Sequence, residues 1–129
     1  MIYFDHEKLK VYQRAMDFVI WQEPVLKKLP AGTTIKDQFD RAAISIVLNI
    51  AEGNGKSGAK DRRRYFEISR GSALECAACL DILYSKKLID KQEVSAGKEL
   101  LRAVVAMLTK LNQSLTNMVK EESPEYDGE

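Results

Sequence analysis

Apolar residues recur every three or four positions in four long segments of the chain, a spacing that predicts amphipathic helices. Short links between such helices place sequence neighbours antiparallel. The sequence therefore predicts an all-α fold, an antiparallel up-down-up-down four-helix bundle formed by residues 1–121. The expected helices span about 5–29, 34–52, 58–87 and 90–121.

Several residues mark where these helices begin, end or bend. Pro24 lies inside the first helix and removes one backbone hydrogen bond, which predicts a kink or break near residues 20–23. Asp90 with Glu93 has the spacing of a capping box at a helix start, and Thr34 with Asp37 comes close to it.

Glycines supply further expectations. Gly53 and Gly55 follow the second helix and are expected to form a left-handed cap there. Gly71 interrupts the third helix, where glycine costs about 1 kcal/mol relative to alanine. A close approach of a neighbouring helix at Gly71-Ser72 would explain it.

Two helices have a predicted core face. The fourth helix shows a strict heptad seam. Its residues are Leu101, Val104, Leu108, Leu111, Leu115 and Met118. The third helix is expected to turn Phe66, Ile68, Ala73, Cys76, Leu80 and Leu83 inward.

The first two helices carry more apolar surface than one bundle easily buries. Residues 42–51 are apolar nearly all round, and the first helix has a second stripe at seven-residue steps. Contiguous exposed apolar patches usually mark interfaces, so we expect a homo-oligomer. The alternative is a broad stripe that faces the core of the same bundle. The predicted interface residues are Val11, Phe18, Trp21, Val25, Ile44, Val47 and Leu48.

Length and composition are those of one globular domain. The chain has 129 residues, 45% of them hydrophobic, and no apolar run approaches the roughly 20 residues needed to cross a membrane. Its start lacks the pattern of a secretory signal, which favours the cytoplasm. Cys76 and Cys79 are expected to be free thiols in that reducing compartment.

The chain is poorly supplied with catalytic or metal-binding residues. His6 is the only histidine, and no glutamate precedes a histidine by three positions, as helical di-iron sites require. Cys76 and Cys79 have zinc-like spacing, but they lie in the middle of a helix and no second ligand pair exists. We therefore expect no enzymatic activity, no metal and no cofactor.

The most informative polar segment is the basic run 56–70, in which six basic residues outnumber Asp61 and Glu67. Lysine and arginine at this density suit the phosphates of nucleic acid. Alternatively, the run is a solvated face in which Glu67 pairs with its arginine neighbours. The candidate nucleic-acid-binding residues are Lys56, Lys60, Arg63, Arg64 and Arg70, with Arg41 a lesser candidate.

The charge along the chain is asymmetric. The nine residues 121–129 contain five acids and no base, so the rest of the chain carries about six more basic than acidic side chains. We expect residues 122–129 to be an acidic disordered tail, which could fold back over the basic surface and compete with ligands.

Five stretches of the chain are specific in combination: Phe4–Ala15, Gln38–Ile46, Asn49–Lys56, Arg64–Ile68 and Gly71–Glu75. Together they resemble the bacterial four-helix-bundle proteins encoded in intervening sequences of large-subunit ribosomal RNA genes. The resemblance covers about residues 4–115.

This resemblance implies a homopentamer of bundles around a central channel, with a basic surface that binds nucleic acid and no enzymatic activity. The family is similar to the accessory protein of diversity-generating retroelements, which binds a reverse transcriptase and RNA. We therefore expect a non-enzymatic oligomer that binds RNA, DNA or a nucleic-acid enzyme. The alternative is a scaffold that recruits an acidic protein and ignores nucleic acid.

Overall fold

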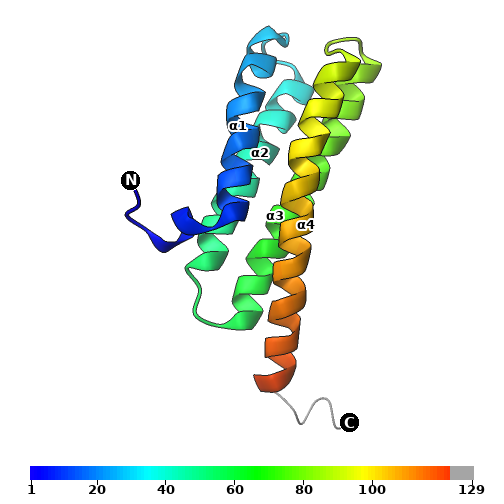
Figure 1. Cartoon of the computed structure of the whole chain (residues 1–129). Helices are drawn as coiled ribbons and strands as arrows, with labels where there is room; N and C mark the ends of the chain where they lie inside the picture. The colour runs from blue at the N-terminus through cyan, green and yellow to red at the C-terminus, as the bar shows by residue number, and fades with distance from the viewer. Residues whose placement is uncertain (123–129) are drawn as a thin grey trace.

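The computed structural model describes residues 1–122, and these residues form helices and connecting turns without any strand (Figure 1). Consecutive helices run antiparallel, as the hydrophobic pattern predicts. The predicted tail lies outside the described residues, except Glu122, which ends the last helix. The elements are the 3-10 helix η1 (Asp5–Lys8) and the helices α1 (Lys10–Lys28), α2 (Thr34–Asn54), α3 (Ala59–Ser85) and α4 (Lys91–Glu122).

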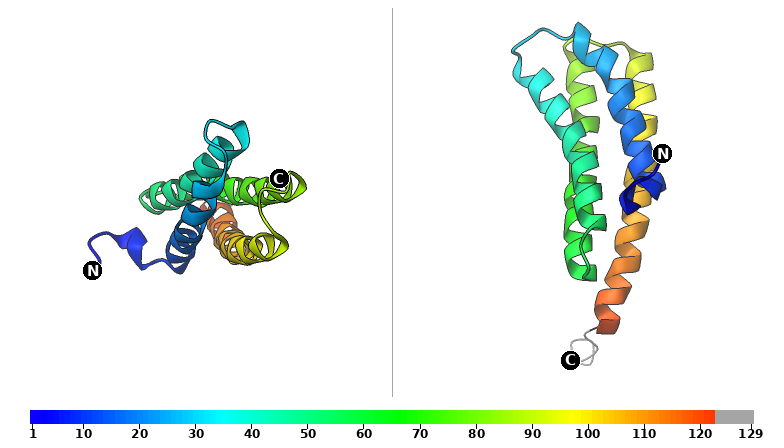
Figure 2. Two further views of the ribbon diagram at one scale, coloured as in Figure 1. Left: turned by 90° about the horizontal axis from the view of Figure 1, so that it is seen from above. Right: turned by 90° about the vertical axis from the view of Figure 1, so that its left-hand side faces the viewer.

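The helices differ in length, and this difference leaves one end of the bundle open. α1 has 19 residues and α4 has 32. The N-terminal end of α1 lies beside the part of α4 that includes Met107 and Ser114, with which it lines a shared hollow. Beyond that point the last turns of α4 extend past α1, with the first turns of α3 beside them (Figures 1 and 2). The α3–α4 interface is therefore uncovered by α1 at this end.

Aromatic and branched side chains fill the centre of the bundle. Phe18 of α1 meets Phe39 of α2 edge-to-face, with ring centroids 6.1 Å apart. Gln22 is buried beside them and donates from Nε2 to the carbonyl oxygen of Phe39 at 2.8 Å, which gives its amide nitrogen a partner. Burial of each large apolar side chain contributes about 1.5–3 kcal/mol to folding.

The predicted core faces are largely correct. On α4, the buried seam residues include Leu101, Val104 and Leu108, whereas Met118 is exposed because it lies at the open end. On α3, all the predicted inward residues are buried except Ile68, which is 46% exposed. The expectation for Ile68 was therefore wrong.

The predicted interface residues of α1 require a correction. Val11, Phe18 and Val25 are buried in the core of this single chain and are not available to another copy. Trp21 is partly buried against Phe18, with ring centroids 5.5 Å apart. The seven-residue stripe is the core stripe of α1 itself, so for this helix the alternative of a broad core-facing stripe is correct.

The predicted interface residues of α2 divide differently. Ile44 and Leu48 keep 46% and 61% of their surface exposed, whereas Val47 is partly buried against the core. Large apolar side chains are also exposed on α3, at Ile68 and Ile82. The surplus apolar surface therefore lies on α2 and α3.

Several predicted helix ends are also corrected. α1 continues through Pro24 without a break, and the carbonyl that loses its donor belongs to Ile20, which is 66% exposed to water. α2 begins after Thr33, which makes no side-chain cap, and Gly55 has an ordinary right-handed φ of −79°.

The capping box of α4 is confirmed. Its two hydrogen bonds join the Asp90 nitrogen to Glu93 Oε1 (2.9 Å) and the Glu93 nitrogen to Asp90 Oδ1 (2.8 Å).

The close approach of α2 and α3 does not occur at Gly71, where the sequence predicts it, but at other small residues. Gly71 faces open space, so the predicted close approach there is wrong, although its neighbour Ser72 is buried and bonds Ser45 of α2 at 2.7 Å. Gly53 lies within α2, where an added Cβ would meet the Phe66 ring at 2.9 Å. The α2–α3 contact is therefore tightest at Gly53 and at the serine pair.

Candidate nucleic-acid interface

Among the polar contacts that join α3 to α4, three follow one another toward the open end of the bundle. Residues three and four positions apart share a helix face, so antiparallel helices can pair them in register. We call these contacts the α3–α4 ladder. Toward the open end, they are Arg70 Nε to Thr109 Oγ1 (2.9 Å), Asn112 Nδ2 to Glu67 Oε1 (2.5 Å) and Arg63 Nη1 to Thr116 Oγ1 (3.2 Å).

The two threonines of the ladder act as neutral acceptors for the arginines. Thr109 donates its own hydroxyl hydrogen to the carbonyl of Val105, and Thr116 donates to the carbonyl of Asn112, each at 2.8 Å. Each hydroxyl oxygen can then accept from an arginine. A hydroxyl group positions a guanidinium group without neutralising its charge.

The ladder arginines have no carboxylate partner among the described residues. The ion pairs found there do not include Arg63, Arg70, Arg64 or Lys60. Glu67 bonds Asn112 of α4 instead of pairing with its arginine neighbours. The positive charge along this edge is therefore available to an outside anion.

Two hollows of about 630 and 520 Å³ lie along the ladder. Glu67, Asn112 and Thr116 line both of them, so the two hollows adjoin, and we call them together the α3–α4 groove. Lys60, Arg63 and Arg64 line the larger hollow, and Arg70, Gln113 and Asn117 line the smaller one. With Asp61 and Glu67, the groove holds four basic and two acidic residues.

The structure separates two predicted residues from this groove. Arg41 lies exposed on α2 and pairs with Asp37 of the same helix at 3.8 Å. Lys56 pairs with Glu52 at 3.3 Å, and its ammonium group lies 5.2 Å from the centre of the Tyr65 ring. Lys60, Arg63, Arg64 and Arg70 are the predicted residues that the fold brings together.

The α4 side of the groove was missed by the sequence analysis. A detectable signal was present, because uncharged polar residues recur at helical spacing next to the apolar seam. That stripe looks like ordinary solvated surface until α3 is placed beside it. Its residues are Thr109, Asn112, Gln113, Thr116 and Asn117.

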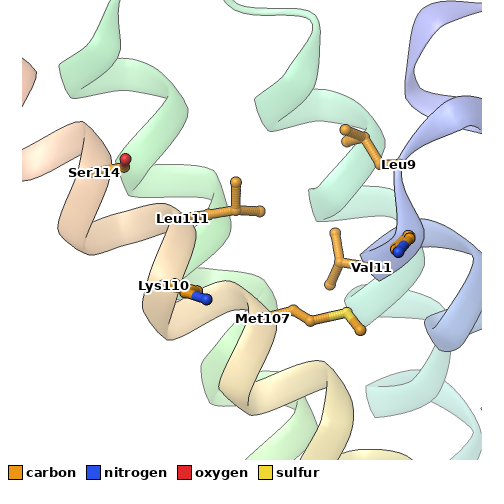
Figure 3. Close-up of a pocket in the computed structure, with 7 residues that line it drawn as sticks. Leu9, Val11, Met107, Lys110, Leu111 and Ser114 are labelled. Atoms are coloured by element: carbon orange, nitrogen blue, oxygen red, sulfur yellow. The ribbon is translucent and has the colours of Figure 1, made fainter.

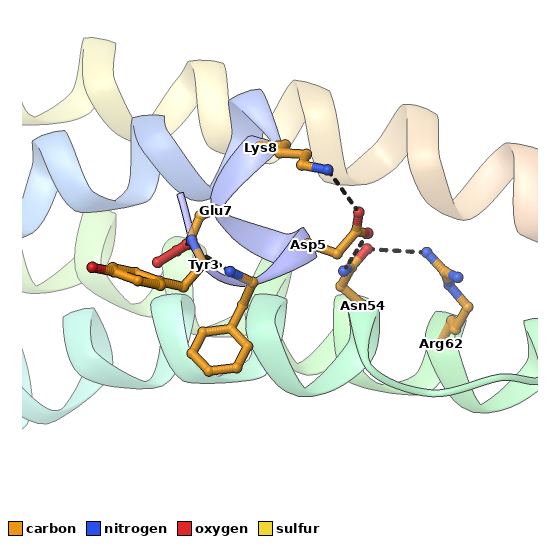
Figure 4. A network of polar contacts seen from close by, with 7 residues as sticks. Tyr3, Asp5, Glu7, Lys8, Asn54 and Arg62 are labelled. Atoms are coloured by element: carbon orange, nitrogen blue, oxygen red, sulfur yellow. Dashed lines mark hydrogen bonds and ion pairs between the residues drawn. The ribbon is translucent and has the colours of Figure 1, made fainter. Parts of the chain in front are cut away.

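Arg62 lies in the same basic run, but it has a structural role. Its Nη2 donates to Asn54 Oδ1 at 3.2 Å, and Asn54 Nδ2 donates to Asp5 Oδ2 at 3.1 Å (Figure 4). Lys8 lies 3.8 Å from the same aspartate. This network ties η1 to the ends of α2 and α3.

A third hollow, of about 430 Å³, lies between the start of α1 and α4 (Figure 3). Leu9, Val11, Met107 and Leu111 make its lining mainly apolar, with Lys10 and Lys110 beside them. Its chemistry differs from that of the α3–α4 groove, because no arginine lines it.

Cys76 and Cys79 are free and buried. Burial raises the pKa of both thiols above the usual value, and the nearby Glu75 raises them slightly further. Both thiols therefore stay protonated at neutral pH, which disfavours thiolate chemistry.

No cluster of three or more metal-ligating side chains occurs within residues 1–122. The helices of that part are also not apolar enough over sufficient length to span a membrane.

Comparison with known proteins finds a family model and solved structures that the chain resembles. The family model described as 23S rRNA-intervening sequence protein matches residues 7–110. A crystal structure of a protein of unknown function, from the S23 ribosomal protein family of Bacteroides thetaiotaomicron, superimposes with a TM-score of 0.74 at 18% sequence identity. The alignment covers 79% of this chain and 97% of that one, so the two share a fold. No curated protein matches the chain.

Proposed function

This chain belongs to the 23S rRNA-intervening sequence protein family, and on that premise we propose that it is a non-catalytic protein that binds nucleic acid through the α3–α4 groove. The observation that carries the proposal is the way Arg63 and Arg70 are held. Each donates to a threonine hydroxyl, and neither is paired with a carboxylate among the described residues. Two positioned, uncompensated guanidinium groups in one groove suit the phosphates of a nucleic-acid strand.

Substituting both arginines tests the proposal. We expect Arg63→Gln with Arg70→Gln to weaken binding of a labelled single-stranded RNA at least about tenfold. Two phosphate contacts are lost, and each contributes roughly 0.7 on a single strand, so the slope of log affinity against log salt should also become shallower by about 1.4. Fluorescence anisotropy at roughly 50 to 200 mM salt, where such binding changes steeply, measures both effects.

Arg14→Gln with Arg102→Gln is the matched control, because it removes the same two charges outside the groove, where Arg14 pairs with Asp17 at 3.2 Å and Arg102 with Glu99 at 3.1 Å. Its binding should equal that of the unaltered chain. Equal binding by the double variant in the groove would refute the groove as the site. Absence of binding to both RNA and DNA, with capture of an acidic protein that survives nuclease treatment, would favour the scaffold alternative.

We also propose that copies of this chain assemble into a ring, the pentamer that the resemblance implies. A ring requires head-to-tail contacts, which join two different patches on each subunit. The supporting observation is that apolar side chains are exposed on two helices, at Ile44 and Leu48 of α2 and at Ile82 of α3. Such a ring would gather the grooves of several copies, in the cytoplasm where nucleic acid is present.

Leu48→Lys is expected to convert the assembly to monomers. Burial of an ammonium group at an apolar contact costs about 2 kcal/mol or more of association free energy. Light scattering measures the mass. Ile20→Lys, on the exposed side of α1, is the control and should leave the mass unchanged. A monomeric unaltered chain would contradict the proposed ring. Binding of a reverse transcriptase stays a prediction of the resemblance.

A further inference from the structure

Glu67 is out of place in a groove that serves only to bind phosphates. It lies between Arg63 and Arg70 along α3 and lines both hollows. Its Oε1 accepts from Asn112 Nδ2, and no described residue donates to its Oε2. A carboxylate repels the phosphate backbone, so its presence here points to a ligand group that donates hydrogen bonds.

Asn112 holds this carboxylate in one orientation. The side chain of Asn112 is 6% exposed, although it stands beside the apolar seam of α4. Because Nδ2 faces a carboxylate, Oδ1 must point the other way, and it is buried without a donor among the described residues. An unsatisfied buried acceptor costs stability, and such groups gather at functional sites. Asn112 is therefore a positioning residue for Glu67.

The free acceptor sites of Glu67 match one nucleobase. A carboxylate accepts at about four lone pairs, and Asn112 uses one of them. Guanine is the base whose Watson–Crick edge carries two adjacent donors, N1–H and the N2 amino group. The corresponding edges of adenine, cytosine and uracil mix donors with acceptors, and an acceptor facing the carboxylate is repelled.

The surroundings of Glu67 suit an unpaired base. The larger hollow, of about 630 Å³, is lined by the exposed side chain of Ile68 and by Arg64. Apolar groups and guanidinium planes both stack on splayed bases. Arg63 and Arg70 stand one turn to either side of Glu67, where phosphates flanking the base would lie. In a duplex the Watson–Crick edge is occupied, so this arrangement selects single strands.

We propose that Glu67 recognises an unpaired guanine in a single-stranded nucleic acid bound in the α3–α4 groove. This inference rests on the proposed function and adds base specificity to it. The carboxylate accepts from guanine N1–H and N2–H while Arg63 and Arg70 contact the neighbouring phosphates.

The test compares four labelled RNA 12-mers, about the length a single groove can cover. One is all uridine, and the others carry a single central guanosine, adenosine or cytidine. The unaltered chain is expected to bind the guanosine strand about tenfold more tightly than the other three. Glu67→Gln is expected to abolish this preference, because its amide presents a donor beside an acceptor.

Glu67→Gln is also expected to bind the all-uridine strand about two- to threefold more tightly, because one negative charge leaves the groove. Asp61→Asn is the matched control, since Asp61 lines the same hollow and loses the same charge. It should retain the guanosine preference. Circular dichroism melting curves verify that both variants fold.

The outcomes separate the two proposals. Equal binding of all four strands by the unaltered chain overturns the guanine inference and leaves nucleic-acid binding in place. A guanosine preference that survives in Glu67→Gln also overturns it. Failure to bind any strand, RNA or DNA, refutes the proposed function itself. Loss of the preference in Glu67→Gln with its retention in Asp61→Asn supports the inference.

Discussion

Gln22→Glu is expected to lower the free energy of unfolding at pH 7 by about 3–5 kcal/mol. Gln22 is 2% exposed, and its Nε2 donates to the carbonyl oxygen of Phe39 at 2.8 Å. An ionised glutamate has the same shape but only acceptors, so it would place a buried charge against that carbonyl. Urea unfolding followed by circular dichroism measures the loss.

The loss should depend on pH in a defined direction. Burial raises the pKa of the new carboxyl group in the folded state above its unfolded value of about 4.3. The folded state then binds more protons than the unfolded state, so the variant loses stability as pH rises through the raised pKa. Near pH 4 the protonated acid can donate to Phe39, and most of the deficit should disappear.

Gln22→Met is the control for this prediction, because it fills similar space without an acceptor at the end of the side chain. It should cost about 1–2 kcal/mol, with no additional dependence on pH relative to the unaltered chain. Parallel pH profiles for the Glu and Met variants would contradict the role given to the Gln22–Phe39 hydrogen bond.

Gly97→Ala is expected to destabilise the bundle by a net of about 2 kcal/mol, although alanine is the better helix former. A Cβ at Gly97 would lie 2.7 Å from Trp21 Cη2 and 2.7 Å from Leu80 Cδ1. The indole ring is rigid and packed against Phe18, so it cannot move aside at low cost. The expected fall in melting temperature is about 6–12 °C.

Gly71→Ala is the matched control, since an added Cβ there meets no atom within 4 Å. It should stabilise the chain by about 1 kcal/mol through helix propensity alone. If the change in unfolding free energy has opposite signs at Gly97 and Gly71, then steric contact and not helix propensity decides the effect at Gly97. A gain in stability at both positions would be inconsistent with the packing described here.

Periodicity was sufficient to predict the helices and most of the core, because burial of one helix face is a local property of the sequence. It could not distinguish a face buried within the chain from one buried against another copy. Val11, Phe18 and Val25 show this, since their stripe was assigned to an interface and forms the core. Gly71 and Gly97 likewise differ only in what the neighbouring helices bring to them.

For a related reason, only the α3 side of the candidate site could be predicted from the sequence. Arg63, Arg64 and Arg70 stand out in the sequence because basic residues cluster there. Thr109, Asn112 and Thr116 become part of the site only through the register between α3 and α4, which is fixed by packing over the whole length of both helices. A resemblance to a family supplies the fold but not the pairing of these particular side chains.

The threonine anchors have a kinetic consequence. Long cationic side chains normally sample many rotamers and lose that freedom when they capture a ligand. Arg63 and Arg70 lose part of this rotamer freedom on folding, because one nitrogen of each guanidinium group already donates to a threonine hydroxyl. Their remaining N–H groups stay available to a ligand. Complexes formed by such pre-set side chains are expected to dissociate slowly, so this groove favours long residence on short strands.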